Sequence, residues 1–356
     1  MIGIEERVMQ AYVLNGVNDL QFKNVNMPEL GRGEVLVRVM ACGICGSDVP
    51  RIYKTGAHVH PLIPGHEFAG EVVDLGLDAD EKWIGKRVGV FPLIPCGECG
   101  PCKKKQYEMC RNYSYLGSRR DGGFAEYVVV PQENLIELPD EVSFEAAAML
   151  EPMAVAVHAM RGIDVKTADT VAVCGMGTIG LLLLMFLREM GVENIFVIGN
   201  KESQKKMAVL TGVCEENFCD TRFCDCEKWL AERTAGKGVD VFFECVGKNE
   251  TVLQAINMTT SGGRVMLVGN PYSDMNLDKT VYWKILRNQL TLKGTWNSSF
   301  THEETDDWHY VLRRLEEKKI NPEVLISHRF PLSELENGLE IMRDKTEDYV
   351  KIMIVN

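Results

Sequence analysis

Four cysteines in the N-terminal third of the chain are spaced closely enough to bind one metal ion. They follow the pattern C-x2-C-x2-C-x7-C on a segment with glycine and proline between them: Cys96, Cys99, Cys102 and Cys110. Four thiolates on such a loop can converge tetrahedrally on Zn²⁺. Because the protein would fill every ligand position, we expect this zinc to be structural and to stabilise a loop that has no core of its own. An iron–sulfur cluster or four unrelated thiols are the alternatives.

A second set of candidate ligands is dispersed along the chain. Cys45 lies in a Gly-Ile-Cys-Gly-Ser-Asp run, His66 and Glu67 follow Pro-Gly, and Glu151 precedes a proline. A thiolate, an imidazole and carboxylates together suit a catalytic zinc that keeps one position open for water or substrate. A single Cys or His is more often a packed core residue, so the prediction depends on the combination.

A glycine-rich turn indicates a bound dinucleotide. The run 175–180 has the form G-x-G-x-x-G, follows an apolar strand-like segment and precedes an apolar helix-like segment. The first glycine permits a tight turn, the second lets the pyrophosphate approach, and the third allows close packing, with the phosphate at the helix N-terminus. The predicted contact residues of this turn are Gly175, Gly177, Thr178, Ile179 and Gly180.

The end of the next predicted strand favours NADP(H) over NAD(H). NAD enzymes usually carry an acidic residue there to bind the ribose hydroxyls. This chain has Gly199 in that place, followed by Asn200 and Lys201. Lys201 could neutralise a 2′-phosphate and Asn200 could donate a hydrogen bond to it. The alternative is that Lys201 is a solvated lysine and the enzyme accepts either cofactor.

Two kinds of scaffold must position these residues. Before residue 143 the chain reads as short strands, such as 35–39, 68–74 and 127–130, separated by Pro and Gly. From residue 170, strands at 171–174, 194–198, 239–243 and 263–268 alternate with helices such as 203–210, which predicts a parallel sheet. The tail ends in a strand at 350–355. We expect an α/β protein in which a β-rich catalytic domain, formed by residues 1–153 with both zinc sites and by 293–356, contains an inserted doubly wound domain at 154–292.

Composition excludes several function classes. The 356 residues carry a formal net charge of −12, which disfavours a nucleic-acid or anionic-membrane partner. No window approaches the roughly 20 apolar residues of a membrane span, and residues 1–9 lack a signal-peptide core, so we expect a cytoplasmic protein. In that compartment cysteines are more typical of metal sites than of disulfides. The irregularly spaced Cys214, Cys219, Cys224 and Cys226 are expected to be free thiols.

The order of these motifs resembles the medium-chain dehydrogenase superfamily. GICGSD, GHE, the four-cysteine loop, LEP and GxGxxG follow one another as in that superfamily and cover nearly the whole chain. Glu151 stands where ordinary alcohol dehydrogenases have a cysteine ligand, as in the polyol (sorbitol-type) branch. Segments 46–58, 117–127 and 284–287 resemble, within that branch, the galactitol-1-phosphate 5-dehydrogenase group.

The resemblance implies a GroES-like catalytic domain, an inserted Rossmann domain, two zinc ions per chain and NAD(P)-linked oxidation of a secondary alcohol. Cys45 and His66 would bind the catalytic zinc, with Glu67 and Glu151 completing the sphere directly or through water. Ser47 would relay the proton of the alcohol and Asp48 would orient the histidine ligand, the alternative for both being an ordinary turn. Further expected cofactor contacts are Val246, Val268, Gly269 and Thr295. The superfamily also suggests a homodimer or homotetramer.

The resemblance favours galactitol 1-phosphate, oxidised at carbon 5 to a keto sugar phosphate, as the substrate. Sorbitol or L-iditol, threonine and a simple secondary alcohol are the alternatives. Where the sorbitol-type pattern has a tyrosine beyond the first ligand, this chain has Arg51, and Asn297 with Ser298 replaces an arginine–tyrosine pair.

Several cations could recognise a substrate phosphate. Arg119 and Arg120 are suited to bidentate contacts, and Lys54 is a further candidate. A solvated cation or an inter-subunit salt bridge is the alternative for each. Two other function classes, a zinc-free quinone or enoyl reductase and a non-catalytic zinc-binding module, are disfavoured by the combined ligand set and the complete dinucleotide turn.

Overall fold

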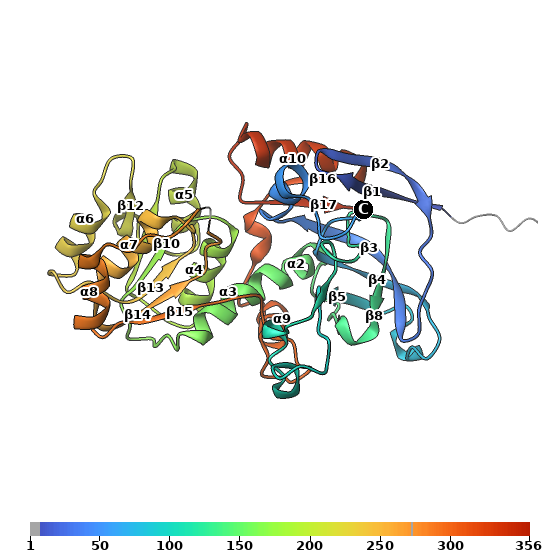
Figure 1. Cartoon of the computed structure of the whole chain (residues 1–356), viewed down its shortest axis with the longest axis horizontal. Coiled ribbons are helices and arrows are strands. Elements are labelled where there is room, and N and C mark those ends of the chain that lie inside the picture. Colours follow the sequence, from blue (N-terminus) through green and yellow to red (C-terminus); the bar gives the residue numbers. More distant parts are fainter. Residues whose placement is uncertain (1–7, 272) are drawn as a thin grey trace, which may run out of the picture. The chain divides into compact units, whose positions relative to one another are not determined.

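The computed structural model describes residues 8–271 and 273–356, and the chain folds into two compact units (Figure 1). One unit comprises the described residues up to Glu151 together with Ser299–Asn356, and the other comprises Pro152–Ser298. The chain therefore leaves the first unit, forms the second and returns. Most of the segment 1–9, for which the sequence predicts no signal peptide, lies outside the described residues.

A seven-stranded sheet forms the core of the first unit. Its order is β16-β17-β3-β4-β5-β9, and β8 also pairs with β3. The strand bounds are β3 Glu34–Ile44, β4 Glu67–Leu75, β5 Arg87–Val90, β8 Tyr127–Pro131, β9 Leu135–Glu137, β16 Ile326–Phe330 and β17 Lys351–Val355. Because β17 lies between β16 and β3, the C-terminal tail is hydrogen-bonded into the sheet that the N-terminal segment begins.

Short elements complete the first unit. A hairpin of β1 (Val8–Gly16) and β2 (Asp19–Asn26) contributes Tyr12 and Leu14 to the core. The two-residue strands β6 (Leu93–Ile94) and β7 (Ser114–Tyr115) pair with each other on either side of the four-cysteine segment. The helices of this unit include α1 (Asp48–Pro50), the π-helical turn η1 (Arg51–Thr55), α2 (Phe144–Ala148), α9 (Asp307–Glu316) and α10 (Leu335–Asp344).

The second unit is a six-stranded parallel sheet that alternates with helices. Helix α3 (Leu150–Gly162) leads into it, and the strand order is β12-β11-β10-β13-β14-β15. The strands are β10 Val171–Cys174, β11 Ile195–Gly199, β12 Phe218–Asp220, β13 Val239–Glu244, β14 Thr259–Leu267 and β15 Thr291–Gly294. The helices are α4 Thr178–Glu189, α5 Glu202–Leu210, α6 Cys226–Arg233, α7 Asn249–Met258 and α8 Lys279–Arg287.

This strand order has a switch point between β10 and β13, the place where doubly wound sheets bind dinucleotides. The fold predicted from the sequence is confirmed. The short strands β12 and β15 and helix α7 of the second unit were not predicted, and β14 begins four residues before the expected strand at residue 263. β12 is short and is followed by polar residues, so it has little periodicity of its own.

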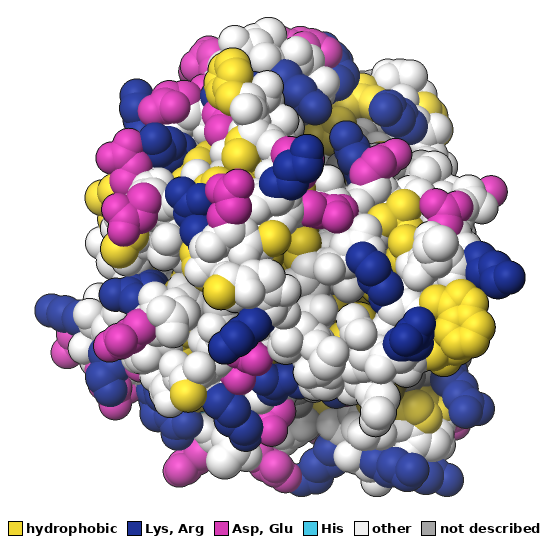
Figure 2. Space-filling model, turned by 90° about the vertical axis from the view of Figure 1, so that its left-hand side faces the viewer, with side chains coloured by type: hydrophobic (Ala, Val, Ile, Leu, Met, Phe, Trp, Pro, Cys, Tyr) yellow, Lys and Arg dark blue, Asp and Glu magenta, His cyan; other side chains and the backbone are white. Residues whose placement is uncertain are grey.

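The described surface contains both charges and apolar side chains. Figure 2 shows Lys and Arg interspersed with Asp and Glu, with small apolar areas between them and no continuous basic surface on that face. Among the helices of the described residues, none is long and apolar enough to cross a bilayer.

Candidate metal centres and dinucleotide site

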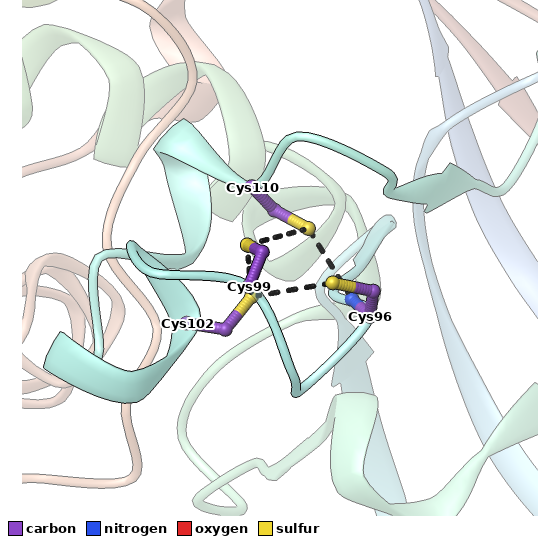
Figure 3. A group of neighbouring side chains, drawn as sticks. All are labelled: Cys96, Cys99, Cys102 and Cys110. Carbon is purple, nitrogen blue, oxygen red and sulfur yellow. Dashed lines mark hydrogen bonds between the residues drawn. The ribbon is translucent and has the colours of Figure 1, made fainter.

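The four cysteines of the loop between β6 and β7 converge on one point (Figure 3). The sulfur–sulfur distances are 3.9 Å for Cys96–Cys102, 3.4 Å for Cys99–Cys102 and 3.9 Å for Cys99–Cys110. Sulfurs of a tetrahedral zinc site lie about 3.8 Å apart, since each Zn–S bond is about 2.3 Å. The loop therefore fits a Zn²⁺ ion whose ligands all come from protein.

The thiols of this loop have unequal acidities. Backbone N–H groups of Arg111 and Cys102 lower the pKa of Cys99 to about 6, which favours its thiolate form. Burial raises the pKa of Cys102 to about 12. A cation among the four sulfurs would allow the remaining thiols to ionise, which is the form that binds metal.

A second group brings together Cys45, His66 and Glu67, whose ligand atoms all lie within 4.8 Å of one another. Cys45 directly follows β3, and His66 directly precedes β4, which Glu67 begins. Gly43 pairs with Glu67 across these antiparallel strands, and a Cβ at Gly43 would collide with the Glu67 carboxylate. Sulfur, nitrogen and oxygen donors in this number suit a catalytic zinc with one open position.

Asp48 holds the first two members of this group in place. Its buried carboxylate accepts a hydrogen bond from the backbone N–H of Cys45 at 3.0 Å and lies 3.5 Å from Nδ1 of His66. Burial favours the neutral imidazole, but Asp48 and Cys45 raise the pKa of His66 well above its usual value. The hydroxyl of Ser47 lies 3.3 Å from the Cys45 sulfur.

Lys351 is a member of this site that the sequence analysis missed. Its side chain is buried, and its ammonium group donates to the Glu67 carboxylate and, at 3.1 Å, to the carbonyl of Ile44. Burial favours neutral lysine, but Glu67 and Cys45 raise the Lys351 pKa. The available signal was weak: Lys351 is a single charge at the start of an apolar strand.

Glu151 lies apart from the three-residue group and has a different partner. The hydroxyl of Tyr115 donates to its Oε1 at 3.2 Å, and the Tyr115 ring packs edge-on against His66 at 5.8 Å. Burial, followed by the nearby charge of Glu67, raises the pKa of Glu151 to about 7. Tyr115 was also missed, because only the fold brings it to Glu151.

The five candidate substrate residues are dispersed. Arg51 is bound to Asp48, and Arg120 is bound to Glu34 at the opposite end of β3 from Cys45. Lys54 is exposed, and Asn297 lies in the second unit with a left-handed backbone.

Arg119 has a different environment. Its exposed guanidinium lies over the Tyr113 ring at 4.7 Å, and that ring contacts Tyr115 at 6.2 Å. Arg119 has no carboxylate partner within residues 8–271 and 273–356. No carboxylate of those residues therefore compensates its positive charge. The Tyr115 ring that contacts Tyr113 also contacts the His66 ring.

The predicted cofactor residues meet at the carboxyl ends of the parallel strands. Gly175 follows β10 with a φ of 99°, Gly177 precedes α4, and a Cβ at Gly180 would collide with the Gly175 carbonyl oxygen. The other predicted contact residues lie on the same edge of the sheet, at or just after the end of a strand or at the start of helix α4: Thr178, Ile179, Gly199, Asn200, Lys201, Val246, Val268, Gly269 and Thr295. This edge is where a dinucleotide lies in such sheets.

Buried Glu244 organises this edge and was not predicted. Its Oε1 accepts hydrogen bonds from the backbone of Val246 at 2.8 Å and Gly247 at 2.9 Å, and from the Thr251 hydroxyl at 2.7 Å. The loop after β13 is thereby fixed against the loop after β14, where a side chain at Gly247 would collide with the backbone of Asn270.

Gly199 is tightly enclosed at the end of β11. A Cβ there would lie 2.7 Å from the Phe218 ring and 2.9 Å from the Gln204 side chain. Gln204 in turn accepts from the backbone N–H of Asn200 at 2.9 Å. An acidic side chain at this position would have to displace both neighbours.

Comparisons with known proteins agree with this geometry. The alcohol dehydrogenase GroES-like domain family matches residues 31–140, and the zinc-binding dehydrogenase family matches residues 178–317. Galactitol 1-phosphate 5-dehydrogenase of Escherichia coli K12 is 34% identical, covering 85% of this chain and 87% of its own length. L-idonate 5-dehydrogenase of Vitis vinifera is also 34% identical, with 92% and 89% covered. A Sinorhizobium meliloti protein described as a zinc-binding dehydrogenase, solved with NADP, has a TM-score of 0.90 at 29% identity, with 98% and 100% covered.

Replacing one cysteine in each group should separate the two metal centres. We expect Cys45→Ala to abolish activity without unfolding the protein. Cys99→Ala should destabilise it by more than the ~3 kcal/mol that bounds most single substitutions, because a structural metal is lost. Urea unfolding and zinc content measure both effects, with the exposed Cys214→Ala as the control. Equal loss of stability in the first two variants would contradict the assignment.

Two glycines of the G-x-G-x-x-G turn should behave differently. Gly180→Ala forces a Cβ against the Gly175 carbonyl and should lower the unfolding free energy by about 1–3 kcal/mol, as overpacking does. No atom lies within 4 Å of a Cβ at Gly177, so Gly177→Ala should cost less than about 1 kcal/mol, the scale of a helix cap. Its new methyl group should instead weaken NADPH binding, measured by nucleotide fluorescence. Equal destabilisation by both changes would argue against these roles.

Proposed function

Because the chain belongs to the zinc-dependent medium-chain dehydrogenases, which are NAD(P)-linked alcohol and polyol dehydrogenases, we propose that it oxidises a secondary hydroxyl of a phosphorylated polyol. The favoured substrate is galactitol 1-phosphate, with NADP⁺ as the hydride acceptor and a keto sugar phosphate as the product. The observation that carries the phosphorylated substrate is the exposed guanidinium of Arg119 over the Tyr113 ring, which contacts the Tyr115 ring beside His66.

Two zinc ions per chain are part of this proposal. Cys96, Cys99, Cys102 and Cys110 would hold the structural ion, and Cys45, His66 and Glu67 would hold the catalytic one. Glu151 would act from outside the catalytic ligand set, since the described ligand atoms that cluster do not include its carboxylate.

Several residues of the chain would take part in the proposed oxidation. When bound, Zn²⁺ supplies a Lewis acid that polarises the substrate hydroxyl. Ser47, whose hydroxyl lies 3.3 Å from the Cys45 sulfur, would accept the hydroxyl proton and pass it outward. Asp48 fixes the orientation of His66, and Lys351 neutralises the Glu67 carboxylate. The hydride leaves the hydroxyl-bearing carbon for the nicotinamide, so the products are a ketone, NADPH and a proton.

A substrate phosphate would be recognised through Arg119. The Tyr113 ring supports the guanidinium face, which leaves its N–H groups free for a bidentate phosphate contact. Arg51 and Arg120 are held by Asp48 and Glu34, so they contribute less to this proposal.

The proposed preference for NADP⁺ rests on the end of β11. Gly199 leaves no room for the acidic residue typical of NAD enzymes, and Asn200 and Lys201 follow it. The Sinorhizobium meliloti structure that contains NADP shows that a similar fold holds this cofactor.

We also propose that two copies associate through the second unit. β15 is the edge strand of its sheet, and helix α8, which precedes it in the chain, exposes Tyr282, Trp283 and Leu286, each by half or more. Soluble proteins usually cover open strand edges and exposed aromatic side chains. A two-fold pairing of β15 with its copy would cover both features.

Other substrates are alternatives to galactitol 1-phosphate, because the relatives differ in the substrates that they are named for. They include an L-idonate 5-dehydrogenase and an L-threonine 3-dehydrogenase, and sorbitol and a simple secondary alcohol are further alternatives. A zinc module that binds nucleic acid is disfavoured by the net charge of −12 and by the mixed charges in Figure 2.

A matrix of initial rates tests the substrate and the cofactor together. We expect galactitol 1-phosphate with NADP⁺ to give the highest kcat/KM in a matrix that crosses NAD⁺ and NADP⁺ with galactitol 1-phosphate, sorbitol, threonine and 2-propanol. Arg119→Ala should raise KM for the phosphorylated polyol about 10- to 100-fold, the scale of a hydrogen bond to a charged group, and leave KM for sorbitol unchanged.

Arg233→Ala is the matched control, because Arg233 also lies over an aromatic ring, Trp229, at 4.6 Å but belongs to the second unit. Equal rates on galactitol 1-phosphate and sorbitol would remove the phosphate from the proposal and leave the dehydrogenase assignment in place.

The association surface can be tested by adding charge to α8. We expect the wild-type protein to have two or four times the 40.0 kDa mass of one chain in light scattering. The double change Trp283→Lys and Leu286→Lys should dissociate it, because like charges would face each other across the two-fold axis. Leu77→Lys, at a 72% exposed residue of the first unit, should have no effect. A monomeric wild-type protein would refute the proposed interface.

A further inference from the structure

The two glutamates of the candidate catalytic centre are held by different kinds of partner. Glu67 is bound by the ammonium group of Lys351, a buried cation. Glu151 is bound by the hydroxyl of Tyr115, which within the described residues is its one hydrogen-bond partner. A cation neutralises a carboxylate, whereas a tyrosine hydroxyl orients it without changing the net charge.

The two glutamates also differ in how close their carboxylates lie to the other candidate metal ligands. An oxygen of Glu67 lies within 4.8 Å of the Cys45 sulfur and of a His66 nitrogen, and Glu151 does not belong to this set. Glu151 lies in the first turn of helix α3, so its backbone is held in the helix. Its carboxylate can therefore move by rotation of the side chain. The bond to Tyr115 limits that rotation.

The Tyr115 side chain is itself firmly placed. Its backbone pairs with Leu93 in the small β6–β7 sheet, and its ring contacts the rings of His66 and Tyr113. A hydroxyl on such a fixed ring is a rigid hydrogen-bond donor, and positioning of this kind by outer partners strongly affects metal sites.

We propose that Tyr115 is a positioning residue whose hydroxyl holds the Glu151 carboxylate outside the metal-ligand set and so keeps the fourth ligand position open for substrate. This inference rests on the proposed function, in which Cys45, His66 and Glu67 bind Zn²⁺ and an alcohol enters the remaining position. Without the hydroxyl, Glu151 can rotate toward the metal and compete with the alcohol.

Tyr115→Phe tests the inference because it removes the hydroxyl and keeps the ring. In the Co²⁺-substituted protein without substrate, we expect this variant to change the visible absorption bands relative to wild type, as a new oxygen ligand would. The four-cysteine loop is unaltered, so its contribution cancels in the difference spectrum. In the zinc enzyme, KM for the alcohol should rise about 3- to 10-fold, the scale of one lost hydrogen bond, with kcat nearly unchanged.

Two further variants make the test specific. Tyr107→Phe, at a half-buried tyrosine of the cysteine loop, should leave the spectrum as in wild type. In a Glu151→Gln background, Tyr115→Phe should no longer alter the spectrum, because the amide lacks the charge that competes for the metal. A spectral change that persists in that background would overturn the inference, since the effect would then come from the ring against His66.

The possible failures are distinguishable. If wild type binds Co²⁺ at both centres and oxidises an alcohol, but Tyr115→Phe has the wild-type spectrum and KM, the role of Tyr115 is wrong and the proposed function stands. If wild type takes up metal at the four-cysteine loop alone and reduces neither NAD⁺ nor NADP⁺, the proposed function fails, and the inference fails with it.

Discussion

The buried ion pair between Glu67 and Lys351 is the interaction on which the first unit depends. Taking two charges out of water is costly, and their attraction offsets that cost only when the geometry is close. Close geometry requires β17, β3 and β4 to be adjacent, with the side chain of Lys351 reaching Glu67 beside the bare backbone of Gly43. The C-terminal tail must therefore return to the N-terminal sheet, so the same contact that neutralises a buried carboxylate also joins both ends of the chain in one domain.

Around this pair the centre gathers three buried carboxylates. Asp48, Glu67 and Glu151 are all buried, and burial followed by the charge of Glu67 raises the pKa of Glu151 to about 7. A bound cation would stabilise such a concentration of donors, and it would do the same for the four sulfurs of the cysteine loop. The two centres differ in construction. One uses a short segment with regular spacing, and the other gathers ligands from strand ends that are far apart in the sequence.

The second unit depends on a different constraint: backbone segments of its loops approach one another closely. Gly175 and Gly180 meet at the turn before α4, and Gly247 and Gly269 meet where the loops after β13 and β14 cross. Glu244 accepts hydrogen bonds from the backbone N–H groups of Val246 and Gly247 in the loop after β13. The result is one edge of the sheet that carries few side chains, which a pyrophosphate can approach. At the end of β11, Phe218 and Gln204 likewise leave no space for a side chain at Gly199.

The sequence by itself determined what depends on local spacing: the four-cysteine loop, the G-x-G-x-x-G turn and the strand–helix alternation of the second unit. It also predicted Cys45, His66, Glu67 and Glu151 as a candidate ligand set, of which the structure clusters the first three. Tertiary structure alone decided the partners of individual side chains. Lys351 reaches Glu67 across 284 positions of sequence, and Tyr115 reaches Glu151. Arg120 is bound to Glu34, at the opposite end of β3 from the candidate ligand Cys45. The reason is physical. A strand displaced by one residue turns every side chain to the other face, so the pairing of distant charges follows from strand register and from burial, and neither can be read from a residue's neighbours in the chain.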